Sequence, residues 1–253
     1  MLLGFFMLEL SPFLYIFIGI AVIFGGILRG ICGFGFSLTL VVALTFFLPP
    51  LLTTSLIFIW EILASILHLP FVRKHVDWKA IKWLCLVCLI GTPFGVYSLL
   101  LIPPAPMTMI INLTVIVLSL IMLRGYTLKR SLNACEIVGT GAISGIINGA
   151  SANGGPPVIL FFFSSPAGAG VGRASLIAYF LFTDSFASSI LILKGAMNMQ
   201  IFATALCYIP CLALGIWIGS KFYHRIDEQK FKRFVIILLI IISSFGCIKA
   251  LLA

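Results

Sequence analysis

Apolar runs long enough to cross a lipid bilayer constrain this chain more than any other feature. A transmembrane helix needs about 20 mostly apolar residues to span a hydrocarbon core of about 30 Å. Seven runs approach or exceed this length, at residues 12–29, 51–70, 80–101, 106–123, 171–193, 200–220 and 234–252. Hydrophobic residues make up 62% of the chain and charged residues 9%, which is too much apolar surface for a water-soluble domain to bury. We therefore predict an all-α polytopic membrane protein.

The positive charge of the chain indicates membrane orientation rather than nucleic-acid binding. The net charge is +9, but the basic residues lie mostly in short loops between apolar runs, where positive charge marks the cytoplasmic side. The predicted partners are the lipid bilayer and a small anionic substrate, with no nucleic acid. The three histidines are scattered and belong to no metal-binding or catalytic motif, so we expect no metal, no cofactor and no enzyme activity. The sequence leaves the oligomeric state open.

Two glycine-rich breaks interrupt the apolar pattern. The first extends from Gly25 to Thr39 and the second from Gly145 to Pro157. Because lipid offers no hydrogen-bond partner to an open backbone, an unwound segment at membrane depth has to face protein or a wet cavity. Each break precedes a short apolar segment, 36–48 or 156–165. The sequence leaves open whether these segments cross the membrane or re-enter it.

The order of breaks and spans recurs in the two halves of the chain. A shift of 119 residues places three glycines of one break on three of the other: Gly26, Gly30 and Gly35 on Gly145, Gly149 and Gly154. Weak repeats of this kind are common in secondary transporters, although glycine-rich helices also resemble one another by chance. The recurrence predicts one integral membrane domain built from two inverted repeats, 1–128 and 129–253. Each repeat would contain a broken-helix hairpin and three spanning helices, giving eight to ten membrane segments.

Charge counting predicts the direction in which each hairpin enters the membrane. If both breaks are hairpin tips, the loops at 71–79, 124–133 and 221–233 face one side together with Lys82 and Arg173, and that side carries 13 of the 16 basic residues. The positive-inside rule then places this side in the cytoplasm and both termini outside. The first hairpin would enter from outside and the second from inside, with their tips meeting near the midplane.

The two breaks together predict an anion-binding site. A helix that starts at a glycine turn presents free N–H groups and the positive end of its dipole, which attract an anion. The candidate substrate-binding residues at the breaks are Cys32, Gly33, Gly35, Ser37, Thr39, Asn148, Ser151, Asn153, Gly154 and Gly155. Packing is the alternative explanation, because Gly26-x-x-x-Gly30 and similar motifs in the chain match the small-xxx-small pattern of closely packed membrane helices.

Three charged residues in the apolar runs are further candidates. Arg29 lies at the first break, where it either holds an oxyanion through its fork of donors or snorkels to the cytoplasmic surface. Glu61 and Asp184 lie near the middle of their runs, 123 residues apart. Intramembrane carboxyl groups often carry protons in transporters, so both are candidates for proton coupling. The alternative for each is a carboxyl group that holds helices together.

Three stretches of the chain resemble the TauE/SafE family of sulfite exporters, also called TSUP transporters. They are residues 33–42 (GFGFSLTLVV), 73–78 (RKHVDW) and 153–160 (NGGPPVIL). The resemblance covers nearly the whole chain and implies transport of sulfite or a related small organosulfur anion across the inner membrane of a bacterium. The chain has no Walker-type phosphate loop, so we expect a substrate or proton gradient to drive a secondary transporter. The alternatives are a membrane-embedded enzyme and a membrane subunit that does not transport.

Overall fold

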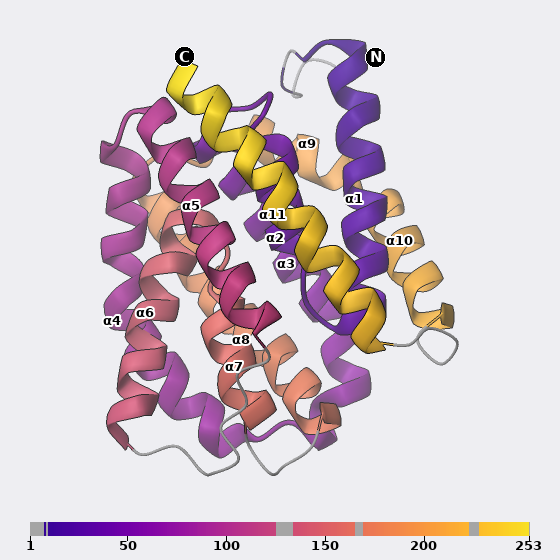
Figure 1. Cartoon of the computed structure of the whole chain (residues 1–253), viewed down its shortest axis with the longest axis vertical. Coiled ribbons are helices and arrows are strands. Elements are labelled where there is room, and N and C mark those ends of the chain that lie inside the picture. Colours follow the sequence, from indigo (N-terminus) through magenta and orange to yellow (C-terminus); the bar gives the residue numbers. More distant parts are fainter. Residues whose placement is uncertain (1–7, 9, 125–133, 165–168, 223–227, 253) are drawn as a thin grey trace.

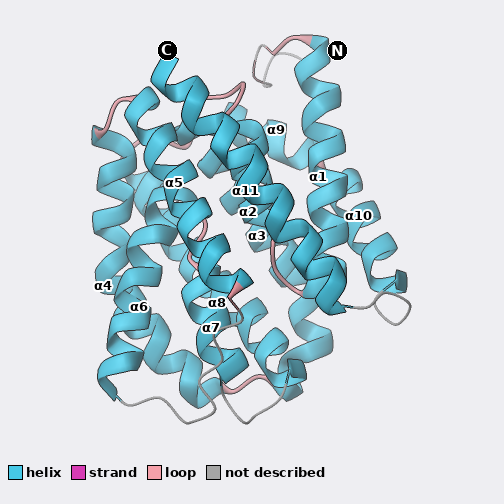
Figure 2. Cartoon of the chain, in the orientation of Figure 1, coloured by secondary structure: helices cyan, strands magenta, loops and turns pink. Residues whose placement is uncertain are grey.

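The protein is a bundle of helices in its computed structural model (Figure 1), which describes residues 8, 10–124, 134–164, 169–222 and 228–252. Helices and turns make up these residues, with no strand among them (Figure 2). In chain order the helices are α1 (Pro12–Cys32), α2 (Phe36–Leu44), α3 (Pro50–Val72), η2 (Arg73–His75), α4 (Trp78–Leu101), α5 (Pro104–Leu123), α6 (Ala134–Ser151), α7 (Gly155–Ser164), α8 (Ala169–Leu193), α9 (Met199–Cys207), α10 (Ile209–Phe222) and α11 (Glu228–Leu252). The predicted all-α class is confirmed.

Six of the described helices are long and apolar enough to cross a membrane, namely α1, α3, α4, α5, α8 and α11. The predicted span at 200–220 is bent instead, because α9 and α10 meet at an angle of 43°, and together they would make a seventh span. Pro210 near the start of α10 has no backbone N–H, which explains why the helical hydrogen bonds are interrupted there. Helices α2 and α7 have 9 and 10 residues, or about 14–15 Å of length, which is too short to cross the membrane.

The two ends of the bundle can be told apart by the elements that they contain. Helices α3 and α5 begin, and α11 ends, around one crevice that is lined by Pro50, Pro104 and Lys249. The start of α1 lies at the same end (Figure 1), which we name the terminal end. The opposite end contains η2, and the start of α8 lies beside it because the Ser175 hydroxyl accepts the Asp77 N–H at 2.9 Å. We name this the loop end.

Each glycine-rich break is the turn of a helical hairpin, and the two hairpins point in opposite directions (Figure 1). Helix α1 runs from the terminal end to the first break, and α2 leads back, since residues 45–50 line the crevice at the terminal end. Helix α6 runs parallel to α4, with Gly141 beside Leu84 and Gly149 beside Gly95. It therefore leads away from the loop end to the second break, where α7 turns back.

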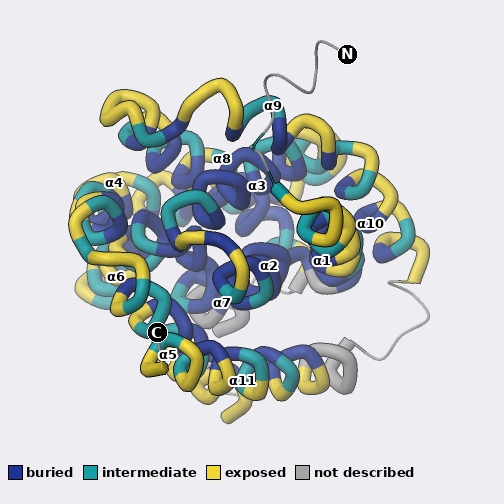
Figure 3. Tube along the Cα trace, turned by 90° about the horizontal axis from the view of Figure 1, so that it is seen from above, coloured by how far each residue is buried: buried dark blue, intermediate teal, exposed yellow. Residues whose placement is uncertain are grey.

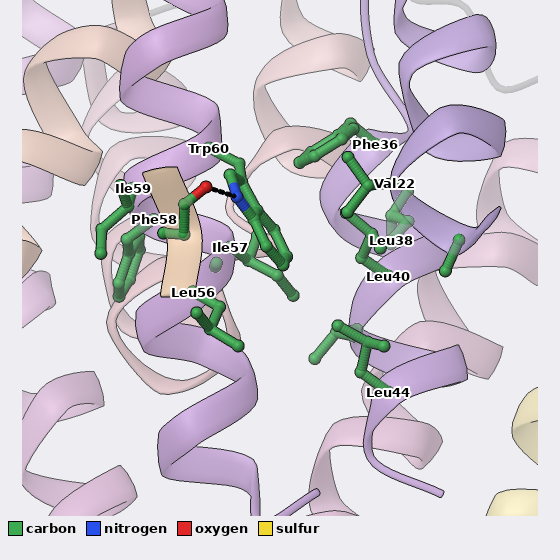
Figure 4. Packing of buried hydrophobic residues seen from close by; sticks show 14 of the residues in the cluster. Val22, Phe36, Leu38, Leu40, Leu44, Leu56, Ile57, Phe58, Ile59 and Trp60 are labelled. Carbon is green, nitrogen blue, oxygen red and sulfur yellow. Dashed lines mark hydrogen bonds between the residues drawn. The ribbon is translucent and has the colours of Figure 1, made fainter. Parts of the chain in front are cut away.

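The centre of the bundle contains α2, α3, α7 and α8, which are the most deeply buried elements when the bundle is viewed along its length (Figure 3). The pairs α1–α10, α4–α6 and α5–α11 pack around this centre and expose their outer faces. Trp60 anchors α3 here, because its indole N–H donates to the Ala205 carbonyl at 2.9 Å (Figure 4). Its ring also meets that of Phe36 on α2 edge-on, with 6.4 Å between the centroids. The first break, which α2 follows directly, is thus held next to this packed centre.

Candidate functional site

Gly33 and Gly35 shape the first break. Gly33 ends α1 with φ 79° and donates its N–H to the Arg29 carbonyl at 2.8 Å, and Gly35 begins α2 with φ 92°. Residues other than glycine rarely adopt these left-handed angles. The sharp turn between α1 and α2 therefore depends on both glycines, and it places Arg29 one helical turn before the break.

Arg29 is fully buried at this break and reaches across to α3. Its guanidinium forms an ion pair with Glu61, whose side chain is 1% exposed, and it donates to the Ser65 hydroxyl at 2.8 Å. The guanidinium carbon lies 5.9 Å from the centre of the Phe180 ring on α8. Snorkelling to the cytoplasmic surface is therefore wrong for Arg29. A buried guanidinium paired with one carboxylate is a group for which an anion can compete.

Asn148 connects the second break to Asp184. Its amide nitrogen donates to one carboxylate oxygen of Asp184 at 2.8 Å, and its amide oxygen accepts the Gly154 N–H at 3.1 Å. Ser144 holds the same turn, since its hydroxyl donates to the Gly154 carbonyl and hydrogen-bonds the Tyr179 hydroxyl at 2.7 Å. The second break is thus held by side-chain hydrogen bonds, and its turn includes Ala152 at a left-handed φ of 57°.

Three buried polar atoms at the second break have no hydrogen-bond partner in the described part of the chain. They are the amide nitrogen and oxygen of Asn153 and the second carboxylate oxygen of Asp184. Both side chains are at most 1% exposed. Buried polar groups are nearly always hydrogen-bonded in native proteins. These atoms are therefore available to a substrate group, a water molecule or a proton.

The Phe180 ring lies between the two breaks. Arg29 approaches it from the first break, and a Cβ atom added to Gly155 at the second break would lie 2.8 Å from its Cζ atom. The breaks thus approach each other through α8, and an aromatic side chain separates them in this conformation. A narrow cavity of about 20 Å³ beside Gly35 lies on another side of the first break, against apolar side chains of α5 and α11.

Other candidate residues satisfy the backbone of their own hairpins. Thr39 donates to the Gly35 carbonyl at 2.9 Å, and Ser151 donates to the Ile147 carbonyl at 2.9 Å. Ser37 is buried in α2. The side chain of Cys32 lies outside the described residues. To bind a substrate, the hydroxyl groups of Thr39 and Ser151 would have to give up these hydrogen bonds to backbone carbonyls.

Close helix packing explains the four-residue glycine motifs. A Cβ atom on Gly30 would lie 2.8 Å from the Cα atom of Gly219 on α10, and one on Gly149 would lie 2.8 Å from the backbone nitrogen of Val96 on α4. Backbone atoms cannot move aside as a flexible side chain can, so neither position has room for a side chain. These motifs hold α1 against α10 and α6 against α4, and they are distinct from the left-handed turn at Gly33.

Sequence reasoning missed several contacts of the breaks, including those of Ser65, Phe180, Ser144 and Arg173. Ser65 follows Glu61 by four residues and so lies on the same face of α3, which is the one signal that could have identified it. From the sequence, Arg173 is interpreted only as one of the positive charges that mark the cytoplasmic side. In the structure its guanidinium donates to the Gly30 carbonyl at 2.9 Å. That contact joins residues 143 positions apart, so no local pattern indicates it.

Comparison with known proteins identifies the family of this chain. A family model described as "Sulfite exporter TauE/SafE" matches residues 18–245, a range that includes both breaks and Arg29, Glu61 and Asp184. Searches of curated proteins and of solved structures gave no significant match. The all-helical fold with six or seven candidate spans agrees with a multi-pass membrane transporter. The chain therefore belongs to the TauE/SafE sulfite exporter family of membrane transporters.

Proposed function

We propose that the protein is a secondary transporter that exports sulfite or a related small organosulfur anion across the inner membrane of a bacterium. The observation that carries this proposal is the fully buried Arg29 at a helix break beside the core. A guanidinium presents a planar fork of donors that matches an oxyanion, and its hydrogen bonds are stronger where the local dielectric is low. The substrate oxygens would take the place that the Glu61 carboxylate occupies in this conformation.

Both breaks would contribute to the anion site. The first supplies Arg29 and the backbone N–H groups at the start of α2, and the second supplies the Asn153 amide and the start of α7. A helix N-terminus of this kind favours an anion without a charged side chain. Movement of the Phe180 ring would join the two half-sites, since that ring contacts Arg29 and closely approaches Gly155.

Charge balance supports coupling of transport to protons. Arg29 brings one positive charge, while Glu61 and Asp184 bring two negative charges when ionised, and each side chain is at most 1% exposed. An added anion would increase the excess of negative charge in a low-dielectric interior, which is costly unless a carboxylate is neutralised. A proton on Glu61 would release Arg29 to the substrate. A proton on the unpartnered oxygen of Asp184 would leave its hydrogen bond from Asn148 intact.

Matching helix contacts support the proposal of two inverted repeats, 1–128 and 129–253. Helix α1 begins the first half and packs on α10 of the second half. Helix α6 begins the second half and packs on α4 of the first half. Helices α4 and α10 hold equivalent places in the two halves. The polar pairs correspond as well, because a shift of 119 relates Arg29 to Asn148 and a shift of 123 relates Glu61 to Asp184. Inverted repeats of this kind allow alternating access by rocking one half against the other.

The distribution of basic residues supports a cytoplasmic loop end and external termini. Described basic residues at the loop end are Arg73, Lys74, Lys79, Lys82, Arg124, Arg173, Lys221, Lys230, Lys232 and Arg233, and those at the terminal end are Lys194 and Lys249. Residues 125–133 and 223–227, which carry further predicted loop charges, lie outside the described residues. The excess of positive charge at the loop end is what the positive-inside rule requires of a cytoplasmic face.

Uptake into proteoliposomes tests the proposed role of Arg29. Labelled sulfite would be offered with and without a pH gradient, and thiosulfate, taurine and sulfoacetate would serve as competitors. We expect Arg29→Gln to abolish flux, whereas Arg73→Gln, which removes an exposed guanidinium at the loop end, should retain it.

A second variant separates lost binding from misfolding. Arg29→Gln leaves the Glu61 carboxylate buried without its partner, so it can lose activity by failing to fold. The double variant Arg29→Gln/Glu61→Gln removes both charges and keeps the side-chain volumes similar. If this folded double variant transports sulfite at the wild-type rate, the proposed anion site is wrong.

A further inference from the structure

We propose that Arg173 forms a second anion subsite on the loop-end side of the first break, which substrate reaches before Arg29 when it arrives from that side. This inference rests on the proposed transport of a small anion. Arg173 lies in the second turn of α8, and Ser175 close to it contacts Asp77 at the loop end. A residue from the second half of the chain thus covers the break in the first half.

The side chain of Arg173 covers the turn at Gly33. A Cβ atom on Gly33 would lie 2.5 Å from Cγ and 3.0 Å from both Cδ and Nε of Arg173. Beyond this stem, the guanidinium donates to the Gly30 carbonyl at 2.9 Å. Arg29 leaves the same stretch of α1 in another direction, towards Glu61 on α3. Two guanidinium groups therefore flank one helix break.

The bond from Arg173 to Gly30 is one that an anion can replace. The Gly30 carbonyl is a neutral acceptor near the C-terminal end of α1, which suits a basic side chain there. A sulfonate or sulfite group is charged and has several oxygens, so it can form an ion pair with the guanidinium through two parallel N–H···O bonds, which the neutral Gly30 carbonyl cannot. An arriving anion would replace the Gly30 carbonyl as the acceptor of the Arg173 guanidinium. Loss of that bond would free the turn at Gly33 from the Arg173 side chain that covers it. It would then pass from Arg173 to Arg29, the next guanidinium.

This arrangement predicts an effect that depends on the side from which substrate arrives. Arg173 lies between the first break and the loop end, so it would act on anions from that side only. Arg29 would act on anions from both sides. A residue that merely staples α8 to α1 would influence both directions equally through stability or turnover.

Transport measured from both faces of the membrane tests the subsite. We expect Arg173→Gln to raise the KM for sulfite about tenfold when sulfite is supplied at the loop-end face, as loss of a charge-assisted hydrogen bond requires. The KM for sulfite supplied at the terminal-end face should change by less than about twofold. Inside-out and right-side-out vesicles supply the two faces, Arg173→Lys tests whether a charge without the fork suffices, and Arg73→Gln is the matched control. A KM that is unchanged, or that rises equally from both faces, overturns the subsite.

Two glycine variants provide an independent measurement. Gly33→Ala and Gly35→Ala both place a methyl group on left-handed backbone, but only the methyl at position 33 would strike the Arg173 stem. Gly33→Ala should therefore reproduce the one-sided rise in KM, whereas Gly35→Ala should affect both faces alike. Identical behaviour of the two variants contradicts the role of Arg173. Normal transport by the Arg29→Gln/Glu61→Gln variant would instead reject the proposed anion site at Arg29. Absence of sulfite flux through the wild-type protein would reject the proposed function itself, so these failures are distinguishable from failure of the Arg173 subsite.

Discussion

Replacing Glu61 with glutamine tests the pairing of Arg29 most directly. Glutamine preserves the size of the side chain but removes its charge, so Arg29 would lose its ion pair and keep the hydrogen bond to the Ser65 hydroxyl and the contact with the Phe180 ring. Removal of one partner from a buried ion pair typically costs about 3–5 kcal/mol. In a chain of this size each kcal/mol lowers the melting temperature by about 2–4 °C, so we expect a loss of roughly 6–20 °C.

Thermal unfolding in detergent, followed by tryptophan fluorescence, measures this loss. The double variant Arg29→Gln/Glu61→Gln should be more stable than Glu61→Gln alone, because Arg29 is then no longer left as a buried charge without its partner. A double-mutant cycle then gives the coupling between the two residues. If the single substitutions are additive, or if Glu61→Gln melts with the wild type, the buried pair does not stabilise the bundle as we argue.

Sulfite should partly restore the stability of the Glu61→Gln variant. A ligand that binds only the folded state stabilises it by about 2.7 kcal/mol at a concentration of 100 Kd. The anion would supply the missing negative charge beside Arg29, with no carboxylate competing for the same donors. The shift in melting temperature should therefore be larger for Glu61→Gln than for the wild type. An equal or smaller shift would refute competition between the substrate and Glu61.

Three further predictions concern other parts of the bundle. Gly30→Ala should lower the free energy of unfolding by about 1–3 kcal/mol, because its methyl group would meet the backbone of α10. Gly139→Ala is the control, since nothing lies within 4 Å of its Cβ position, and it should melt at the temperature of the wild type. Ser65→Ala removes a hydrogen bond to a charged group and should lower the free energy of unfolding by about 1.5–3 kcal/mol. It should also raise the KM for sulfite, and Ser65→Thr, which keeps the hydroxyl group, should have a wild-type KM, whereas Ser65→Val should not. Asp184→Asn should abolish the response of sulfite flux to an imposed pH gradient, and an unchanged response would remove Asp184 from the coupling mechanism.

Glycine positions show how far residue type can be interpreted. The two breaks were predictable because glycine-rich sequence inside an apolar run is a local signal. Which glycines bend the chain and which permit packing was not predictable, since Gly30 and Gly33 lie only three residues apart in the same glycine-rich stretch. Gly30 faces the backbone of α10, whereas Gly33 needs φ 79° and contacts Arg173. That distinction requires knowledge of the neighbouring helices.

The sequence by itself determined the membrane class, the positions of the breaks and the family, because apolar length and glycine spacing are properties of short segments. Only the tertiary structure decided the partners of the charged groups. Arg29 could have reached the surface or a ligand, and it is the position of α3 within reach of the Arg29 side chain that gives it Glu61 and Ser65, the latter 36 residues away. Electrostatic partners depend on distances of a few ångströms between helices, and such distances are set by how all the helices pack together.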